Sequence, residues 1–245
     1  MRLSEKIGLV VGGTGSIGEG VVKALLASGA SVIVLSRSEG RINTLRSYVT
    51  SQYDAKLQSV IGDISHDSEA KRIGSLIKKQ YGELDYLVDC MGGKVQGYPV
   101  YSLPFNQWDR VVNTNLTCHF LTIKTFIPLL NHQNSYLFHV NSFLAEKTLP
   151  SNGPQAISAA AQKAMILTLA EELRNTGIHV YELITGTIKT RNWDQARKAD
   201  PDWLFPEEIG AYMVEEMTKS QPEKLIHYLL SRSHSMHSSL RSMGT

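Results

Sequence analysis

The sequence predicts an α/β protein whose single domain is built on a doubly wound parallel sheet. Two observations lead to this fold class. Short apolar runs alternate along the chain with longer segments of helical periodicity. A glycine-rich turn joins the first apolar run to the first helical segment. The composition agrees, because 42% of the 245 residues are hydrophobic and 20% are charged, which suffices for a folded core.

The apolar runs predict the strands. Residues 31–36 are β-branched and apolar nearly throughout, which is the pattern of a strand covered on both faces by helices. In chain order the predicted strands are residues 7–11, 31–36, 56–61, 84–89, 135–141 and 178–184, and residues 225–230 form either a last strand or a short helix.

Each predicted helix lies between two of these runs. Ile17, Val21 and Leu25 are spaced four residues apart and would share one face of the first helix. Strand–helix–strand units of this length have right-handed crossovers, so the strands are expected to run parallel. In chain order the predicted helices are residues 16–28, 39–53, 67–81, 106–130, 154–175 and 206–219.

Two segments stand apart from this alternation. Residues 186–205 lack clear periodicity and contain Trp193 and Trp203, and a loop of that length in a compact domain is usually a lid. Residues 232–245 are rich in Ser, His, Met and Arg and predict a flexible tail. With no internal repeat and no linker, residues 1–231 are expected to form one domain.

Composition and charge exclude several classes of protein. The net charge is +2, which gives no support for nucleic-acid binding. Cys90 and Cys118 are too few for a disulfide scaffold and suggest a reducing compartment, so a cytoplasmic location is expected. No apolar run approaches the roughly 20 residues that span a bilayer, and no signal peptide is expected. The eight histidines show no metal-binding spacing.

The glycine-rich turn predicts a dinucleotide site of Rossmann type. Gly12, Gly15 and Gly18 repeat every three residues between a strand and a helix. Side chains there would obstruct a pyrophosphate, whereas the helix N-terminus offers free N–H groups and a positive dipole end. The alternative is a glycine turn with a purely structural role. The residues between the glycines that are also expected to contact the cofactor are Thr14, Ser16 and Ile17.

Arg37 and Asp63 suggest which dinucleotide binds. An NAD site usually has a carboxylate at the end of the second strand, but the nearest one here is Glu39. Arg37 can instead pair with the 2′-phosphate of NADP, which favours NADP over NAD; the alternative is a solvated arginine. Asp63, after the third strand, is placed to accept a hydrogen bond from the adenine amino group, or else it caps a helix or a turn.

The motifs, taken in order, resemble those of the short-chain dehydrogenase/reductase family, and the resemblance covers residues 5 to about 230. The glycine turn and the pair of Asp63 and Ile64 match the family's nucleotide-binding motifs. Residues 89–92 stand at a family motif of which only the glycine is kept, and residues 185–190 resemble the stretch that contacts nicotinamide. The resemblance implies catalytic roles for Ser142, Lys163 and Asn115, and further cofactor contacts at Ile64, Gly92, Lys163 and Thr190.

The helix at residues 154–175 departs from the family. Members carry tyrosine and lysine one helical turn apart, the tyrosine giving a proton to the substrate oxygen. If Lys163 is the lysine, Ala159 stands where the tyrosine belongs, although the interval from Ser142 to Ala159 is then a few residues longer than usual. Another group would have to donate the proton. The candidates are Ser142 working with a Lys163–Asn115 relay, Tyr98, Tyr101 and His139, although period 2 puts His139 on the strand face opposite Ser142.

Three functions remain open at this point. The first is an NADP(H)-binding oxidoreductase that acts on a carbonyl or hydroxyl group of a small molecule with a non-standard proton donor. The second is a non-redox isomerase, dehydratase or cyclase on the same scaffold. The third is a catalytically silent cofactor-binding protein. By resemblance, the chain is expected to form a homodimer or homotetramer through its two long helices, residues 106–130 and 154–175.

Overall fold

The computed structural model describes residues 3–94, 96–191, 193, 200–219 and 225–233, and it is organised around one sheet of seven strands. All six strand pairs are parallel, in the order β3-β2-β1-β4-β5-β6-β7. This confirms the predicted fold class. The strands are β1 (Ile7–Val11), β2 (Ser31–Ser36), β3 (Leu57–Ile61), β4 (Tyr86–Asp89), β5 (Ser135–Ser142), β6 (Ile178–Thr185) and β7 (Ile226–Leu229).

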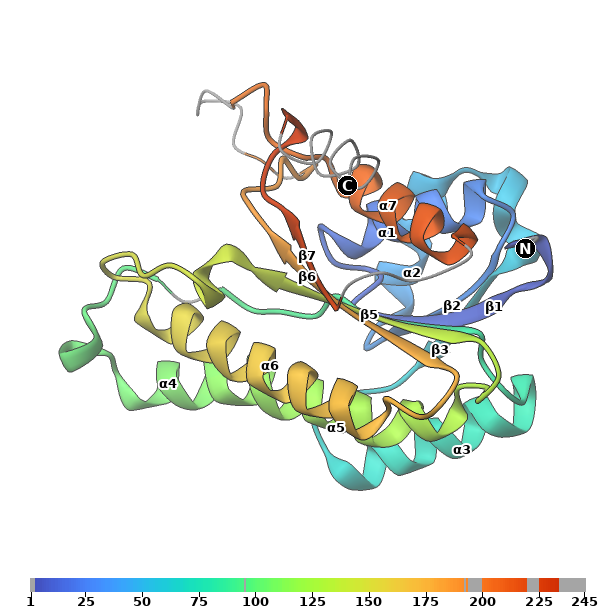
Figure 1. Ribbon diagram of the computed structural model, residues 1–245, viewed down its shortest axis with the longest axis horizontal. Helices are drawn as coiled ribbons and strands as arrows, with labels where there is room; N and C mark the ends of the chain where they lie inside the picture. Colours follow the sequence, from blue (N-terminus) through green and yellow to red (C-terminus); the bar gives the residue numbers. More distant parts are fainter. Residues whose placement is uncertain (1–2, 95, 192, 194–199, 220–224, 234–245) are drawn as a thin grey trace.

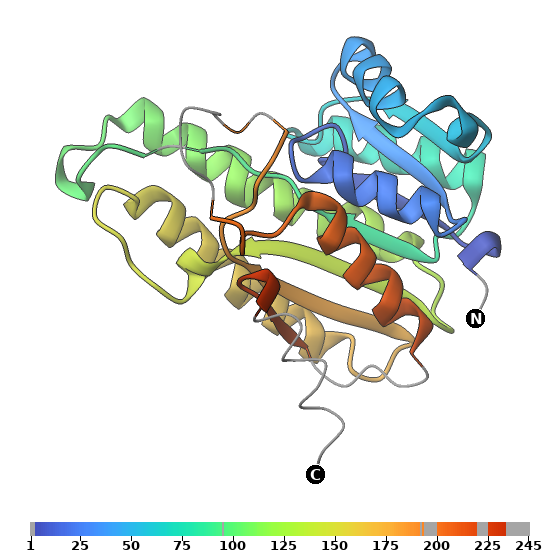
Figure 2. The same ribbon diagram turned by 90° about the horizontal axis from the view of Figure 1, so that it is seen from above.

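Helices cover both faces of this sheet (Figures 1 and 2). On one face lie α1 (Gly18–Ala27), α2 (Glu39–Val49) and α7 (Pro206–Thr218), whose apolar side chains share one core with the strands. On the other face α3 (Asp67–Tyr81), α5 (Cys118–Phe126) and α6 (Gly153–Glu172) pack into a second core.

Strand β1 shows how one sequence serves both cores. Val10 points into the first core, whereas Leu9 and Val11 point into the second. Successive side chains of a strand face opposite ways, so a strand covered on both sides has to be apolar at every position. Strands β1 and β4 are neighbours although two further strands lie between them in sequence. The chain therefore reverses its direction of winding there, and the carboxyl ends of these strands leave a crevice for a ligand.

The predicted helix 106–130 is divided into four parts. Helix α4 (Phe105–Val112) runs into a π-helical turn, Asn113–Thr117, then into α5 and a short 3-10 turn, Ile127–Leu129. A π-turn inserts one extra residue into the helical ladder and often occurs at functional sites. Periodicity could not reveal it, because the apolar spacing on either side stays helical.

The other boundaries lie within three residues of the prediction, except the end of the second predicted helix. Helix α2 ends at Val49, because Thr50 takes a φ of +73° that an α-helix does not accommodate, and Ser51–Lys56 continue as a 3-10 helix. Near the C-terminus, the element whose type was open is strand β7, which pairs with β6.

The expected lid and tail fall partly outside the described residues, at 192, 194–199 and 234–245. In the described part of the expected lid, Arg191 contacts α1. Its guanidinium donates two hydrogen bonds, of 2.8 and 3.1 Å, to the carboxylate of Glu19. The start of the expected tail is also anchored. The backbone N–H of Arg232 donates to the carbonyl of Asp202, and Ser233 donates to the Asp202 carboxylate.

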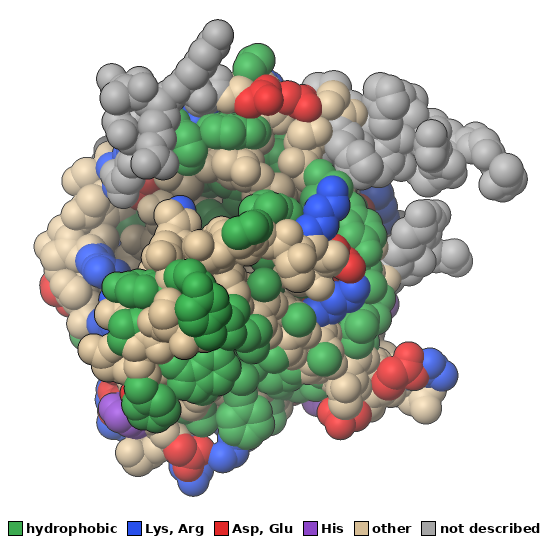
Figure 3. Space-filling view, turned by 90° about the vertical axis from the view of Figure 1, so that its left-hand side faces the viewer, with side chains coloured by type: hydrophobic (Ala, Val, Ile, Leu, Met, Phe, Trp, Pro, Cys, Tyr) green, Lys and Arg blue, Asp and Glu red, His purple; other side chains and the backbone are tan. Residues whose placement is uncertain are grey.

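Hydrophobic side chains gather on the end of the molecule where α4 and α6 begin (Figure 3). Val100, Tyr101 and Phe105, which precede or open α4, are 62%, 92% and 79% exposed. Among the described residues, the longest apolar helices still fall short of what a membrane crossing requires.

Candidate active site

Two adjoining cavities open at the carboxyl ends of the strands. The first, of about 340 Å³, lies over β1, β2 and β3, and the second, of about 400 Å³, lies over β4, β5 and β6. Gly15, Cys90, Met91 and Gly92 line both of them. The two cavities therefore form one groove across the crevice that the reversed winding creates.

The glycine turn lies where the two cavities meet. Gly12 has a φ of +86°, and a Cβ there would come within 2.8 Å of the Cys90 backbone. A Cβ on Gly18 would lie 2.2 Å from the Gly12 carbonyl oxygen. Only glycine fits these positions. Ile17 offers no side-chain cap, and α1 begins directly after the cavity-lining residues Ser16 and Ile17, so the positive end of its dipole lies beside the groove. Of the predicted contacts in this turn, those that line a cavity are Gly12, Thr14, Gly15, Ser16 and Ile17, whereas Gly18 packs beneath them.

The far end of the first cavity carries two arginines and one carboxylate. Arg37 and Asp63, both expected from the sequence, line it together with Ile64. Arg41, in the first turn of α2, also lines this end of the cavity. The sequence did not lead us to expect it, although its position four residues after Arg37 was an available signal. Although burial opposes ionisation, hydrogen bonds from Ser65 and the charge of Arg37 hold the pKa of Asp63 below its usual value. The Asp63 carboxylate is thus ready to accept a hydrogen bond.

The π-turn places Asn115 behind the second cavity. The Asn115 amide nitrogen donates to the carbonyl of Gly93 at 2.8 Å, and its amide oxygen accepts the Gly93 N–H at 2.6 Å. The backbone carbonyl of Asn115 accepts a hydrogen bond from the amide of Gln162. Asn115 therefore clamps the segment that follows β4 against the wall of the cavity, and both polar atoms of its side chain are occupied.

Ser142 ends strand β5 at the second cavity, as the sequence predicts. Its hydroxyl oxygen accepts the N–H of Leu144 at 3.2 Å, which leaves the O–H as a donor toward the cavity among the described contacts. Gly92 and Thr190 line the same cavity, also as expected.

Helix α6 presents a different face to the cavity than the sequence suggested. The cavity is lined by Gln155, Ser158, Ala159 and Gln162, which follow each other at spacings of three, one and three residues. Lys163 lies one step around the helix and is not among the lining residues. Its ammonium group is 2.5 Å from the carboxylate of Glu146, and this hydrogen bond raises the pKa of Lys163. The structure thus brings together all the predicted catalytic residues except Lys163.

The other predicted proton donors also lie away from the cavity. Tyr98 and Tyr101 are exposed, and His139 is fully buried against Glu182; none of the three lines the cavity. Burial raises the pKa of the Cys90 thiol, which holds its proton. Among the described residues that line the second cavity, Lys94 is the one with a cationic side chain. Sequence reasoning missed it, although it follows Gly92 by two positions.

One atom that lines the second cavity has no hydrogen-bond partner among the described residues. The amide oxygen of Gln155 is buried and accepts no hydrogen bond. A buried acceptor without a donor is costly. A bound ligand with an O–H or N–H group would satisfy it.

Comparison with known proteins agrees with this geometry. The model of the short chain dehydrogenase family matches residues 6–201. An uncharacterized oxidoreductase of Staphylococcus saprophyticus is 22% identical over 207 residues, which cover 82% of this chain and 88% of the relative. A short chain dehydrogenase of Pseudocercospora fijiensis is 29% identical over 77% of this chain and 62% of its own length.

Solved structures share the fold. A short-chain dehydrogenase/reductase from Serratia marcescens superposes with a TM-score of 0.82 at 21% identity, covering 93% of this chain and 98% of the other. An NADPH-bound short chain oxidoreductase from Pseudomonas aeruginosa with an atypical catalytic center has a TM-score of 0.82 at 19% identity, over 94% and 97% of the two chains. A blue fluorescent protein from a metagenomic library, in complex with NADPH, has a TM-score of 0.79 at 21% identity, over 94% and 97%.

Proposed function

The chain belongs to the short-chain dehydrogenase family, and from that premise we propose that it binds NADPH along the groove and reduces a carbonyl group of a small molecule. The observation that carries the proposal is the groove itself. It joins a glycine cradle and an uncapped helix N-terminus to a cavity that holds Ser142 and Lys94.

The two arginines of the first cavity support NADPH over NADH. Arg37 and Arg41 supply two positive charges beside Ser36 at the end of β2, where the ribose 2′ position of a dinucleotide is expected. A 2′-phosphate would make charge-assisted hydrogen bonds to them. Two of the solved neighbours also contain NADPH.

The face of α6 supports a shifted alignment of the family's tyrosine and lysine. A pair one helical turn apart that faces the cavity fits Gln155 and Ala159, not Ala159 and Lys163. This register also removes the excess length after Ser142. In this register Gln155 replaces the tyrosine and Ala159 replaces the lysine. Neither side chain can donate a proton to an oxyanion.

Lys94 takes the role of proton donor in this proposal. When bound, the cofactor supplies hydride to the carbonyl carbon. The O–H of Ser142 orients the carbonyl oxygen by a hydrogen bond, and the ammonium group of Lys94 stabilises the developing negative charge and transfers a proton to it. The buried amide oxygen of Gln155 accepts a hydrogen bond from a hydroxyl or amine elsewhere on the substrate.

A binding and turnover experiment tests this function. NADPH affinity is measured by fluorescence, and a panel of aldehydes and ketones is screened for loss of NADPH absorbance. Lys94→Met is expected to lower kcat by about 10²–10⁴, with the Kd for NADPH changed less than about threefold. Lys147→Met, which removes an exposed lysine outside the cavity, is the matched control.

Other outcomes assign the chain to the alternatives. Saturable NADPH binding without turnover of any substrate indicates a silent cofactor-binding protein. Substrate conversion without net cofactor change indicates an isomerase, dehydratase or cyclase. Absence of NADPH and NADH binding by folded protein contradicts the proposal as a whole.

The expected homo-oligomer stays a prediction, as does the cytoplasmic location. The expected pairing through α4–α5 and α6 is supported by apolar side chains exposed on these helices. Phe120 on α5 is 50% exposed, and Ile157 on α6 is 45% exposed. Burying such side chains against a second copy would be favourable.

A further inference from the structure

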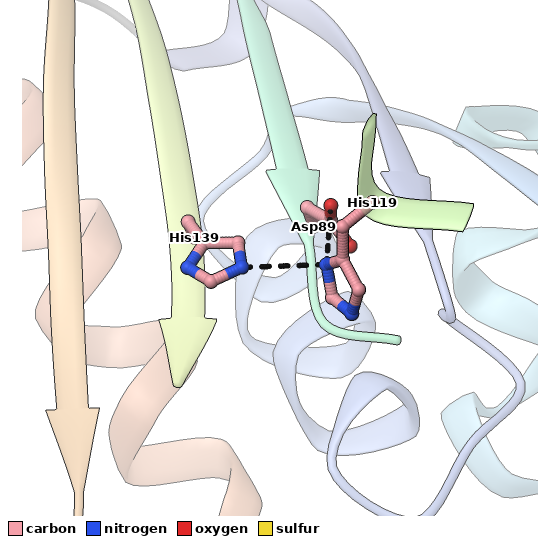
Figure 4. Close-up of side chains that lie close together, drawn as sticks. All are labelled: Asp89, His119 and His139. Atoms are coloured by element: carbon pink, nitrogen blue, oxygen red, sulfur yellow. Dashed lines mark hydrogen bonds and ion pairs between the residues drawn. The ribbon is translucent and has the colours of Figure 1, made fainter. Parts of the chain in front are cut away.

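Four ionisable side chains form a cluster inside the second core, away from the groove. Asp89 on β4, His139 on β5 and Glu182 on β6 are cross-strand neighbours in register, so their side chains share one face of the sheet. His119 on α5 packs onto them from the helix layer (Figure 4). All four side chains are fully buried.

Three of these side chains converge on one point. His119 Nδ1 lies 2.8 Å from Asp89 Oδ2 and 3.3 Å from His139 Nε2. All three atoms lie within 4.8 Å of one another. Figure 4 shows two dashed lines that meet at the Nδ1 of His119, one from His139 and one from Asp89.

The outer atoms of Asp89, His139 and Glu182 have hydrogen-bond partners, whereas Nε2 of His119 is buried and has none among the described residues. His139 Nδ1 lies 2.6 Å from Glu182 Oε2, and Asn141 donates to Glu182 Oε1 at 2.8 Å. The N–H of Met91 donates to Asp89 Oδ1 at 3.3 Å. Hydrogen bonds from the surroundings therefore orient the carboxylates and His139, while the inner atoms Oδ2, Nδ1 and Nε2 face one another.

Protons alone satisfy this arrangement poorly. With both imidazoles neutral, the two carboxylates leave two negative charges in the core, which is unfavourable. With one imidazole protonated, one carboxylate charge stays uncompensated in the core. With both imidazoles protonated, the Nε2–H of His139 points at the Nδ1–H of His119. One divalent cation between the three inner atoms would neutralise both carboxylates and use every inner lone pair.

We propose that Asp89, His119 and His139 bind one divalent transition-metal ion of the zinc class, and that Glu182 orients His139 from behind. Two imidazoles and one carboxylate are ligands that zinc and its neighbours accept, and three protein ligands are common in zinc sites with one further position. A histidine ligand typically donates its other N–H to a carboxylate, as His139 is placed to do toward Glu182.

Two of the three distances between donor atoms are close to those of such a site, and the third, between Asp89 Oδ2 and His139 Nε2, is within 4.8 Å. Zinc–ligand bonds of about 2.0–2.1 Å in a tetrahedron place neighbouring donor atoms about 3.3 Å apart. The two histidine nitrogens already have that separation. Asp89 Oδ2 and His119 Nδ1 would have to move apart by about 0.5 Å on binding, from 2.8 Å.

The ion would connect elements that support the groove without touching it. Asp89, His119 and His139 are absent from the lining of both cavities. Asn141, however, bonds Glu182 with its amide nitrogen, which also donates to the carbonyl of Ala159, and its amide oxygen accepts the N–H of Ser142. The ion would therefore fasten β4, β5 and α5 together beneath the catalytic end. This role is independent of the proposed reductase activity.

The experiment measures metal binding directly. The wild-type chain is unfolded with chelator, refolded with Co²⁺ or Zn²⁺, freed of loose ions, and analysed by elemental mass spectrometry and visible absorption. We expect one equivalent per chain, intense ligand-field bands for Co²⁺ in a low-symmetry site, and a higher Tm than that of chain refolded without metal.

Variants identify the ligands. His139→Gln and His119→Gln are expected to weaken metal affinity by more than about 100-fold, and Glu182→Gln by about 10–100-fold. His179→Gln, which changes a histidine of β6 that bonds Asn134 outside the cluster, is the matched control and keeps full occupancy.

Either of two results overturns the proposal. One is wild-type protein that refolds fully but retains less than about 0.1 equivalent of Co²⁺ and of Zn²⁺. The other is a folded His139→Gln chain that binds as tightly as His179→Gln. If the ligand variants do not fold, the occupancy and the Co²⁺ spectrum of the wild-type protein decide the matter.

Discussion

Arg37 and Arg41 illustrate what single residues contribute to the candidate site. They are four residues apart in sequence, just after β2 and in the first turn of α2, and both line the first cavity. Their charges face Asp63, whose carboxylate is held ionised and accepts the Ser65 N–H. A carboxylate and two guanidinium groups at one end of a groove distinguish ligands by charge and by hydrogen-bond donors.

Removing one of these arginines should change cofactor preference. Arg37→Ala is expected to raise the Kd for NADPH by about 10–100-fold, because a charge-assisted hydrogen bond contributes roughly 1.5–3 kcal/mol. The Kd for NADH should change less than about threefold. The readout is the ratio of the two constants by fluorescence titration. Arg46→Ala, on α2 but bonded to Asp54 and to the carbonyl of Leu57, is the control. Equal losses for both cofactors would contradict a 2′-phosphate contact.

Lys163 is a second residue whose neighbours decide its role. Since its ammonium group is engaged by Glu146 outside the cavity, Lys163→Met is expected to leave the Kd for NADPH within about threefold of the wild-type value. Isothermal calorimetry measures this. A tenfold or larger loss of affinity for NADPH in a folded variant would contradict this expectation and support the direct cofactor contact that the family resemblance implies.

At the scale of elements, the orientation of α6 determines the chemistry of the groove. The helix is long and rich in alanine, so its sequence does not say which face is turned inward. Packing against the π-turn and β5 selects the face that carries Gln155 and Ala159. The π-turn, in turn, frees the carbonyl of Asn115 to accept from Gln162.

Restoring the family's pair at this face should increase carbonyl reduction. The double change Gln155→Tyr with Ala159→Lys places a phenol and an ammonium group one turn apart toward the cavity, and the cation lowers the phenol pKa. We expect at least a tenfold rise in kcat for simple ketones. Ala159→Tyr alone, the matched control, puts the phenol at the position of the lysine and should give no gain. The opposite ranking in folded proteins would place the tyrosine position at Ala159.

Helices α3 and α5 are joined by an ion pair that provides a pH test. Hydrogen bonds from Lys124 and Lys71 lower the pKa of Asp67 to about 2. Because this pKa lies below that of the unfolded chain, the pair stabilises the fold above about pH 4 and the contribution disappears as the pH falls through 2. Lys124→Met should raise the midpoint of Asp67 in a carboxyl NMR titration. Lys78→Met, on the same helix as Asp67, should leave that midpoint unchanged.

At the scale of the whole molecule, the groove lies at the carboxyl edge of the sheet, and helices cover both faces of the sheet. Helices α5 and α6 line or support the groove with one face. With the other face they expose Phe120 and Ile157. A surface of this kind suits a symmetric contact between two copies, since the same patch meets itself across a twofold axis.

Disrupting that surface should produce monomers. Phe120→Asp places a charge in the expected interface and should shift the sedimentation coefficient from that of a dimer or tetramer to that of a monomer. Tyr101→Asp changes a more exposed aromatic residue outside these helices and should leave assembly intact. A wild-type chain that sediments as a monomer at micromolar concentration would contradict the prediction.

The sheet and the cofactor end of the groove were predictable from the sequence because their signals are local. Each strand is marked by an apolar run, and the backbone of the turn admits only glycine at Gly12 and Gly18. Arg37 and Asp63 follow strands directly, and parallel strands bring their carboxyl ends to one edge. In each case neighbours in sequence carry the necessary information.

Tertiary structure alone decided the catalytic end and the buried cluster. Which face of α6 lines the cavity, and with it the exclusion of Lys163, depends on contacts between elements far apart in the chain. The same holds for Lys94, which reaches the cavity from the segment after β4. His119 lies 30 residues from Asp89 and 20 from His139 in sequence, a spacing without local meaning. Hydrophobic periodicity records how each element faces the core, but which polar side chains meet is set only when strands pair and helices pack.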